Sequence, residues 1–311
     1  MNEFEVIRYP QMNGLNIFFD TVDYRTPHIH PEWELILLLE NALSVTCNQN
    51  TYRVEPGEIL LFSPNQPHEF HRVGESCTFL CLQISPQVVG QAFPAVERLT
   101  VDGLFPREYL PAEDYDWAKG EMLSLMGAYL YREPCYELFC MGQGMLLLHR
   151  ILTGMPHHIL SAGEQNSRDK SSARLKRLIQ FVDENFMHKI RLSDFAEAEG
   201  CSVSYLSHFV KETLNQSFQE YVNTVRFNCA CKLIASGRRR MLDVCVESGF
   251  SDYRYFSRTF QQQVGMTPEE YRLRADRPEQ SGAAVKHSLH SLERFYTREQ
   301  SLELWDRFTE N

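Results

Sequence analysis

The sequence predicts an α+β multidomain fold with an N-terminal β-barrel, a helical segment in the middle and an all-α C-terminal domain. Three observations lead to this prediction. Short apolar runs bounded by turn residues fill the first hundred positions, helical periodicity begins near Glu113, and one helix-turn-helix pattern occurs twice after Arg174. A chain of 311 residues with 43% hydrophobic content has room for more than one globular domain.

Residues 1–112 are expected to form the barrel. Three of the apolar runs are LILLL (35–39), LSVTC (43–47) and EILLF (58–62), and glycine, proline and asparagine residues mark turns between them. Short strands with turn signals at this spacing are typical of a β-barrel or a β-sandwich.

Residues 113–160 are expected to form two antiparallel helices, with Pro134 between them. In the second helix, five apolar residues alternate three- and four-residue steps, which places them on one stripe. They are Leu138, Met141, Met145, Leu148 and Leu152. Such a stripe either packs on the barrel or joins two subunits, and we predict a homodimer that is joined here.

Residues 161–173 and 276–311 flank the C-terminal domain, which is expected over residues 174–275. The first segment, SAGEQNSRDKSSA, is polar, rich in small residues and without periodicity, which predicts a flexible linker. The second ends in a weakly amphipathic stretch, and the sequence assigns it no role.

The net charge of −10 would argue against nucleic-acid binding, but it is distributed unevenly. Residues 1–173 hold 11 Lys and Arg against 22 Asp and Glu, whereas residues 174–275 hold 15 against 12. Local charge is therefore a better guide than total charge. Nine cysteines without a CxxC pair, no apolar run of membrane-spanning length and no secretory signal together predict a reduced, cytoplasmic chain away from membranes.

The two segments LSDFAEAEGCSVSYLSHFVK (192–211) and MLDVCVESGFSDYRYFSRTFQ (241–261) follow the same plan. Each has a helix with a small residue, then a glycine (Gly200 or Gly249), and then a serine (Ser202 or Ser251) that is expected to cap a second helix. The small residue lets two helices cross closely and the glycine allows the tight turn, which together predict a helix-turn-helix unit. Two such units in one chain are more specific than one.

These motifs resemble the DNA-binding domain of AraC/XylS-family transcriptional regulators. The match is strongest in GFSDYRYFSRTFQQQVGMTPEEYR (249–272), and VRFNCACKLIASG (225–237) resembles the helix that connects the two units in this family. The resemblance implies that the chain binds double-stranded DNA and influences RNA polymerase.

The resemblance also implies two recognition helices, at about 203–212 and 252–262, each in a major groove. The implied base-contacting residues are Ser204, Ser207, His208, Arg254, Tyr255 and Arg258. Arginine commonly binds guanine through two hydrogen bonds, so the second helix is expected to carry more sequence information. The alternative for its arginines is a solvated face or contact with phosphate only. The neighbouring Arg238, Arg239 and Arg240 are expected to bind phosphate, with plain solvation as the alternative.

The N-terminal segments PHIHPEWELILLL (27–39) and EPGEILLFSPNQPHEF (55–70) resemble the two motifs of cupin barrels. The resemblance implies a ligand set of His28, His30, Glu34 and His68, which suits Fe, Mn, Ni or Zn. Two positions depart from the cupin pattern, because Asn41 stands near the expected glycine and Arg72 stands where many cupin enzymes have asparagine.

The predicted function is a transcription regulator, not an enzyme, in which a small effector binds inside a cupin-like barrel. A sugar or related metabolite is the effector class that the resemblance favours. Trp33, Phe70 and Tyr9 are candidates for a stacking face, although Trp33 is equally suited to the barrel core. No cofactor is expected, because the four polar residues can bind a polar ligand or each other; a divalent metal is the alternative. The rival function is a metal-dependent cupin isomerase or dioxygenase with an autoregulatory DNA-binding domain.

Overall fold

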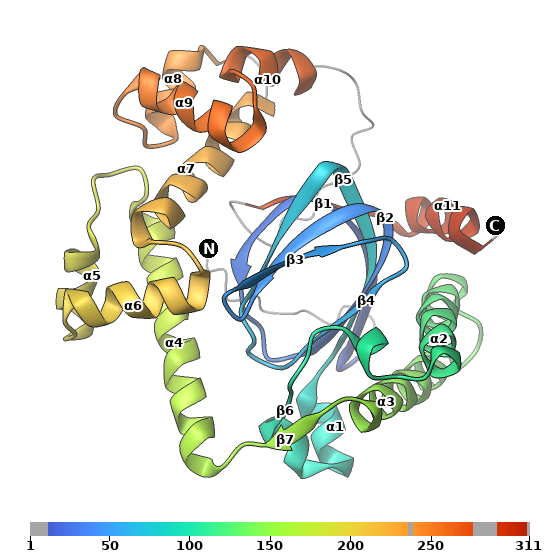
Figure 1. The fold of residues 1–311 in the computed structure, drawn as a ribbon. Helices are drawn as coiled ribbons and strands as arrows, with labels where there is room; N and C mark the ends of the chain where they lie inside the picture. The colour runs from blue at the N-terminus through green and yellow to red at the C-terminus, as the bar shows by residue number, and fades with distance from the viewer. Residues whose placement is uncertain (1–11, 236–238, 276–290, 310–311) are drawn as a thin grey trace.

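The computed structural model describes residues 12–235, 239–275 and 291–309, and it has the predicted fold class (Figure 1). An antiparallel β domain comes first, helices follow, and the C-terminal domain contains two helix-turn-helix units. No helix among these described residues combines the length and apolar character needed to cross a bilayer.

The barrel is built from three long and two short antiparallel strands that curl around a common interior (Figure 1). The strands are β1 (Leu15–His28), β2 (Trp33–Cys47), β3 (Asn50–Val54), β4 (Ile59–Phe62) and β5 (His68–Ile84). Strand β5 pairs with both β1 and β2, and the β1–β5 register ends with His28 opposite His68. This pairing brings together two motifs that are 40 positions apart in the chain.

Alternation along the strands divides the apolar side chains between two cores. Ile36 and Leu38 lie in the barrel interior, whereas Leu35 and Leu37 belong to a second core that the sheet shares with two helices. Those helices are α2 (Ala112–Tyr131) and α3 (Tyr136–Gly154), the antiparallel pair expected from the sequence. Small elements precede and follow the pair: α1 (Pro86–Ala92), η1 (Pro94–Arg98), β6 (Leu99–Val101), η2 (Pro106–Glu108) and β7 (His157–Ile159).

The apolar stripe predicted on α3 is divided between the protein interior and solvent. Leu148 and Leu152 are buried in the core with α2, and Met141 packs against that core. Leu138, by contrast, is 76% exposed. The prediction of one continuous interface stripe is therefore wrong, because most of its members hold α3 on the protomer.

The prediction of a flexible linker over residues 161–173 is also wrong. Residues Ala162–Asn185 form one continuous helix, α4. Ser161 caps it, since its hydroxyl accepts from the Glu164 N–H while the Glu164 carboxylate accepts from the Ser161 N–H. The first half of α4 is polar because it is mostly exposed, and its buried face begins only at Leu175.

The C-terminal domain has two lobes that α7 (Phe218–Ala235) connects. The first lobe contains α5 (Leu192–Glu199) and α6 (Val203–Leu214), and the second contains α8 (Met241–Glu247), α9 (Tyr253–Val264) and α10 (Pro268–Ala275). Each lobe has a separate apolar core. Phe250, Phe256, Phe260 and Leu206 are buried, as the sequence analysis expects of core residues.

The segment after residue 290, to which the sequence assigned no role, returns to the barrel. Strand β8 (Leu292–Phe295) pairs with β1 from Asp20↔Phe295 to Tyr24↔Leu292. Helix α11 (Arg298–Thr309) packs on α2, where the Trp305 indole N–H donates to the Leu123 carbonyl at 3.2 Å. The DNA-binding-type lobes are thus inserted between two parts of the N-terminal domain.

Candidate functional site

The turn of each helix-turn-helix unit is made by a glycine with left-handed backbone. Gly200 has φ 62° and Gly249 has φ 82°. The two caps differ from each other. The Ser202 hydroxyl accepts from the Tyr205 N–H at 3.2 Å, as expected, whereas Asp252 rather than Ser251 caps α9, accepting from the N–H groups of Arg254 and Tyr255. The prediction that Ser251 is the cap is wrong because the helix begins one residue later.

The candidate recognition helices present most of the predicted residues to solvent. Ser204, Ser207 and His208 are exposed on α6, and Arg254 and Arg258 are exposed on α9. The helices are held from behind by the buried core residues of their lobes. These five residues are therefore accessible to DNA, and their base contacts remain predictions.

Tyr255 has a different environment from its neighbours on α9. It is 39% exposed, and its hydroxyl accepts a hydrogen bond from the Asn223 side chain on α7. It also lines a cleft that the barrel residues Glu69 and His71 share with α7 and α9. Tyr255 is thus held by α7 beside this cleft, and its base contact, like those of the arginines, stays a prediction.

The basic residues before α8 are only partly described. Arg239 is half exposed and its guanidinium Nε lies 3.2 Å from a Glu247 carboxylate oxygen. Arg240 is the exposed N-cap residue of α8. Arg238 lies outside the described residues. Phosphate would have to compete with Glu247 for Arg239.

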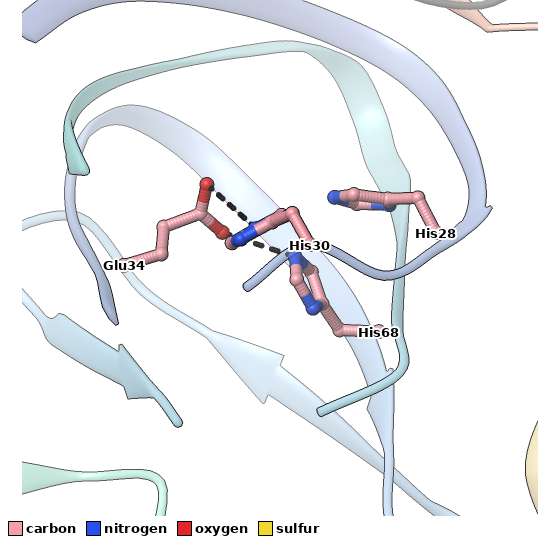
Figure 2. A group of neighbouring side chains, drawn as sticks. All are labelled: His28, His30, Glu34 and His68. Carbon is pink, nitrogen blue, oxygen red and sulfur yellow. Dashed lines mark ion pairs between the residues drawn. The ribbon is translucent and has the colours of Figure 1, made fainter. Parts of the chain in front are cut away.

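The four residues of the cupin-like motifs converge in the barrel (Figure 2). His28 ends β1, His30 follows it, Glu34 lies in β2 and His68 begins β5. All four are buried, and their potential metal-ligating atoms lie within 4.8 Å of one another. We refer to these four residues as the His–Glu cluster.

Glu34 is the centre of the cluster. One carboxylate oxygen accepts from the Gln83 amide at 2.9 Å and lies 3.4 Å from Nε2 of His30. The other lies 3.0 Å from Nε2 of His68. Burial alone would raise the pKa of Glu34, but the positive potential of His30 and the contacts with His30 and His68 lower it well below its usual range.

A backbone carbonyl holds one ring nitrogen of His28 and one of His68. Nδ1 of His28 lies 2.9 Å from the Thr26 carbonyl oxygen, and Nδ1 of His68 lies 2.9 Å from that of Gln66. A carbonyl only accepts, so each Nδ1 carries a proton, and Nε2 of His28 offers its lone pair to Arg25. Burial lowers the pKa of both rings, further reduced for His28 by its neighbours.

His68 and Glu34 form one close contact within the cluster. Nε2 of His68 lies 3.0 Å from a Glu34 oxygen, and neither atom has a well-oriented hydrogen bond within the described part of the chain. At this distance the two atoms require between them either a proton, which makes the pair an imidazolium and a carboxylate, or a metal cation. The donor set of three imidazoles and one carboxylate therefore fits a divalent metal.

Arg25 opposes a metal at this site. Its Nε donates to Nε2 of His28 at 3.0 Å, so the lone pair that His28 would offer is already used. For all four residues to bind a metal, His28 would have to lose its hydrogen bond from Arg25. Arg25 and Gln83 were missed by the sequence analysis, although both are polar residues inside otherwise strand-like runs.

The aromatic residues expected near the cluster are placed differently. Phe70 lies beside it, with its ring centroid 5.2 Å from that of His68, and Phe62 stacks on His68 at 4.1 Å. Trp33 belongs to the other core, with the residues that pack against α2 and α3. The prediction that Trp33 offers a stacking face is therefore wrong, and its core alternative is correct. Tyr9 lies outside the described residues.

A cleft of about 520 Å³ lies between the cluster end of the barrel and the C-terminal domain. Ile29 and Pro67, each adjacent in sequence to a cluster histidine, form part of its barrel side. Arg168 of α4 and Thr213 of α6 are on its other side. Amides and hydroxyls supply most of the remaining lining: Asn48, Gln49, Asn65, Ser167, Ser171 and Ser172.

One departure from the cupin pattern has a local explanation. Asn41 has φ 58°, in the left-handed region, and its side chain donates to the Ser76 carbonyl at 2.9 Å. Asparagine tolerates this conformation better than other non-glycine residues, so it replaces glycine at the bend. Arg72, the second departure, is paired with Asp23 at 3.1 Å and lies outside the cluster.

Two family models match the chain. One, described as an AraC-like ligand binding domain, matches residues 18–124, and the other, a helix-turn-helix domain, matches residues 195–274. The HTH-type transcriptional regulator YdeC of Bacillus subtilis is 26% identical over 256 residues, covering 79% of this chain and 85% of that protein. The melibiose operon regulatory protein of Escherichia coli is 20% identical over 269 residues, covering 81% and 86%.

Among solved structures, ToxT of Vibrio cholerae is similar over 83% of this chain and 97% of its own, at 12% identity and a TM-score of 0.41. The matched ligand-binding domain corresponds to the barrel with most of α2, and the matched helix-turn-helix domain spans both units. The chain therefore belongs to the AraC/XylS family of transcriptional regulators, with an AraC-like ligand-binding domain followed by a helix-turn-helix DNA-binding domain.

Proposed function

We propose that this regulator binds specific DNA sequences under the control of a small polar effector, a sugar or a related metabolite, at the His–Glu cluster. The observation that carries the proposal is the convergence of four buried polar side chains beside the apolar core of the barrel. A few placed polar groups among apolar walls are typical of a small-molecule site. The melibiose operon regulator, a distant relative by sequence, has a name that refers to a sugar.

The adjoining cleft supports a route from effector to DNA. Its barrel wall adjoins the cluster, and its other wall includes α4 and the C-terminal end of α6, the first candidate recognition helix. An effector that changes the position of this wall would move α6 directly. Such coupling is limited to the difference in effector affinity between the two arrangements.

We further propose that the protein works in the cytoplasm as a homodimer and acts on RNA polymerase. The support for a dimer is the outer face of α3, which leaves Leu138, Phe139 and Leu146 at 76%, 43% and 43% exposed. Exposed apolar groups of this kind on one helix favour association with a second subunit. The cluster serves sensing in this proposal, not catalysis.

The test begins with a thermal-shift screen of mono- and disaccharides against the purified full-length protein. A ligand that binds the folded state raises the melting temperature. The double variant Glu34→Gln/His68→Ala should lose the shift and the transcriptional response while it keeps operator binding, because both helix-turn-helix cores lie outside the barrel. Glu75→Gln, an exposed change on the same strand as His68, is the matched control. A double variant that still responded fully would exclude the cluster as the effector site.

A divalent metal is the alternative occupant, favoured by the three imidazoles and one carboxylate whose ligating atoms converge in the cluster. Metal analysis of protein purified without a histidine tag distinguishes the two. About one equivalent of metal, lost in Glu34→Gln but kept in Glu75→Gln, would replace the sugar hypothesis, and turnover assays with the metal-loaded protein would then test the enzymatic alternative.

A further inference from the structure

The C-terminal segment 291–309 is attached to the barrel next to the His–Glu cluster. Residues of β8 pair with β1 up to Tyr24↔Leu292. Just beyond, the Ser291 hydroxyl lies 3.3 Å from both the N–H and the hydroxyl of Thr26. The Thr26 carbonyl oxygen is in turn the partner of His28 Nδ1. The segment therefore contacts the short stretch of β1 that carries the first cluster histidine.

Arg25 links the segment to the cluster through one side chain. Its NH1 lies 2.6 Å from a Glu293 carboxylate oxygen, in an ion pair whose side chains are 7% and 2% exposed. Its Nε donates to His28 Nε2 at 3.0 Å. Both contacts use the same planar guanidinium, so a shift at His28 moves the group that holds Glu293.

The same strand also contacts the second helix-turn-helix unit. Leu292 packs against the apolar core of that lobe, which contains Phe227 and Phe260. It also lines a cleft of about 390 Å³ with Asn228 and Tyr271 on the domain side. The barrel side of this cleft includes Asp23 and Arg72. Leu292 and Glu293 are adjacent residues, so the contact with the cluster and the contact with the second unit are one residue apart.

We propose that β8 is the coupling element between the His–Glu cluster and the second helix-turn-helix unit, with Arg25 as the positioning residue that transmits a change at His28. When His28 binds a ligand or otherwise loses its bond from Arg25, the guanidinium reorients and its hold on Glu293 changes. Strand β8 is held by its pairing with β1 and by Phe295 against Phe18, and at its other end by the ion pair and the Ser291 contacts. A loosened β8 withdraws Leu292 from the second lobe and frees that recognition helix to move.

This inference rests on the proposed function only for the place where the signal begins, which is the effector site. Its test uses no effector. Amide hydrogen exchange is followed by mass spectrometry on the full-length protein. Glu293→Gln keeps the size of the side chain and removes its charge. We expect exchange in β8 and in α8–α10 to become about tenfold faster or more, while α5 and α6 exchange as in the wild type.

Three further variants make the test specific. Glu303→Gln is the same chemical change at an exposed position of the same segment and should behave as the wild type. His28→Ala removes the acceptor for Arg25 and should accelerate exchange in β8 and α8–α10. Leu292→Ala acts at the other end of the relay, so it should accelerate α8–α10 with little effect on β1 and β5.

The outcomes separate the steps of the proposal. Faster exchange confined to β8 in Glu293→Gln would overturn the link to the second unit. Wild-type exchange in His28→Ala beside a loosened Glu293→Gln would overturn the link to the cluster. If Glu293→Gln fails to fold, Leu292→Ala and His28→Ala still decide both links. Loss of effector response in the cluster variants bears on the proposed function alone, because these exchange rates are measured without ligand.

Discussion

Gly249 is the position where one added methyl group should most disturb the DNA-binding domain. Its φ of 82° lies in the left-handed region, which costs an L-residue such as alanine roughly 1–2 kcal/mol. A Cβ there would also lie 2.6 Å from the Phe186 carbonyl oxygen and 2.8 Å from the Met187 Cα. Both are backbone atoms at the end of α4, so they cannot simply rotate away.

The close contact of the added Cβ with the backbone adds to the cost of the left-handed conformation. Overpacking of this kind typically costs about 1–3 kcal/mol. Gly249→Ala should therefore destabilise the second unit by about 2–5 kcal/mol in total. The clash also involves Arg226, which donates to the carbonyls of Phe186 and His188 and so ties α7 to the end of α4. If the backbone moves to relieve this clash, the second unit should shift relative to the first.

Gly200→Ala is the matched control, because Gly200 has φ 62° in the corresponding turn of the first unit and nothing lies within 4 Å of the added Cβ. It should cost only the strain of about 1–2 kcal/mol. Differential scanning calorimetry and hydrogen exchange of α8–α9 measure the difference, and operator affinity should fall further for Gly249→Ala. Equal destabilisation by the two substitutions would refute the argument from close contact.

Four other substitutions test the DNA contacts, the subunit interface and a buried acid. Arg258→Ala should cost about 1–3 kcal/mol on the specific site and relax preference at one base pair, whereas Arg239→Ala should weaken all sequences alike and flatten the salt dependence, as anisotropy titrations would show. Leu138→Glu places a charge on the outer face of α3 and should give folded monomers in sedimentation, while a dimer that persists would exclude this face. Burial raises the pKa of Asp183 from 3.8 to about 7, so the folded state holds a proton that the unfolded state has lost and stability falls as pH rises from about 4 to 7. Asp183→Asn should therefore stabilise the folded state by up to ~4 kcal/mol at pH 8, where the melting temperature should rise clearly, and by much less at pH 5. An equal gain at both pH values would contradict the raised pKa.

The features that the sequence predicted well depend on local chemistry. Each helix-turn-helix unit requires a glycine turn and an apolar stripe within about twenty residues, so its pattern is readable without long-range information. The cluster was predictable as a set because its motifs have fixed spacing. The opposite orientation of Trp33 and Glu34 also follows from strand alternation, since adjacent residues face opposite sides of a sheet.

Other features were missed for identifiable reasons. The start of α4 has a capping signal, Ser161 followed by Glu164, but its polar composition resembles that of a linker because no tertiary contact requires apolar residues there. Strand β8 has four residues and pairs with a partner about 270 positions away. Nothing in its own sequence encodes that partner. The same distance conceals the Arg25–Glu293 pair.

The insertion of the DNA-binding lobes between α3 and β8 determines the order in which the chain can fold during synthesis. Domains generally fold as they leave the ribosome, N-terminal parts first. Here the β1 edge and the α2 surface around Gly127 stay uncovered until residues 291–309 have been made. By then both helix-turn-helix lobes are already available to fold. The DNA-reading part of the protein can thus be complete before the sensor that regulates it, and a chain that stops early would read DNA without the strand that couples it to the barrel.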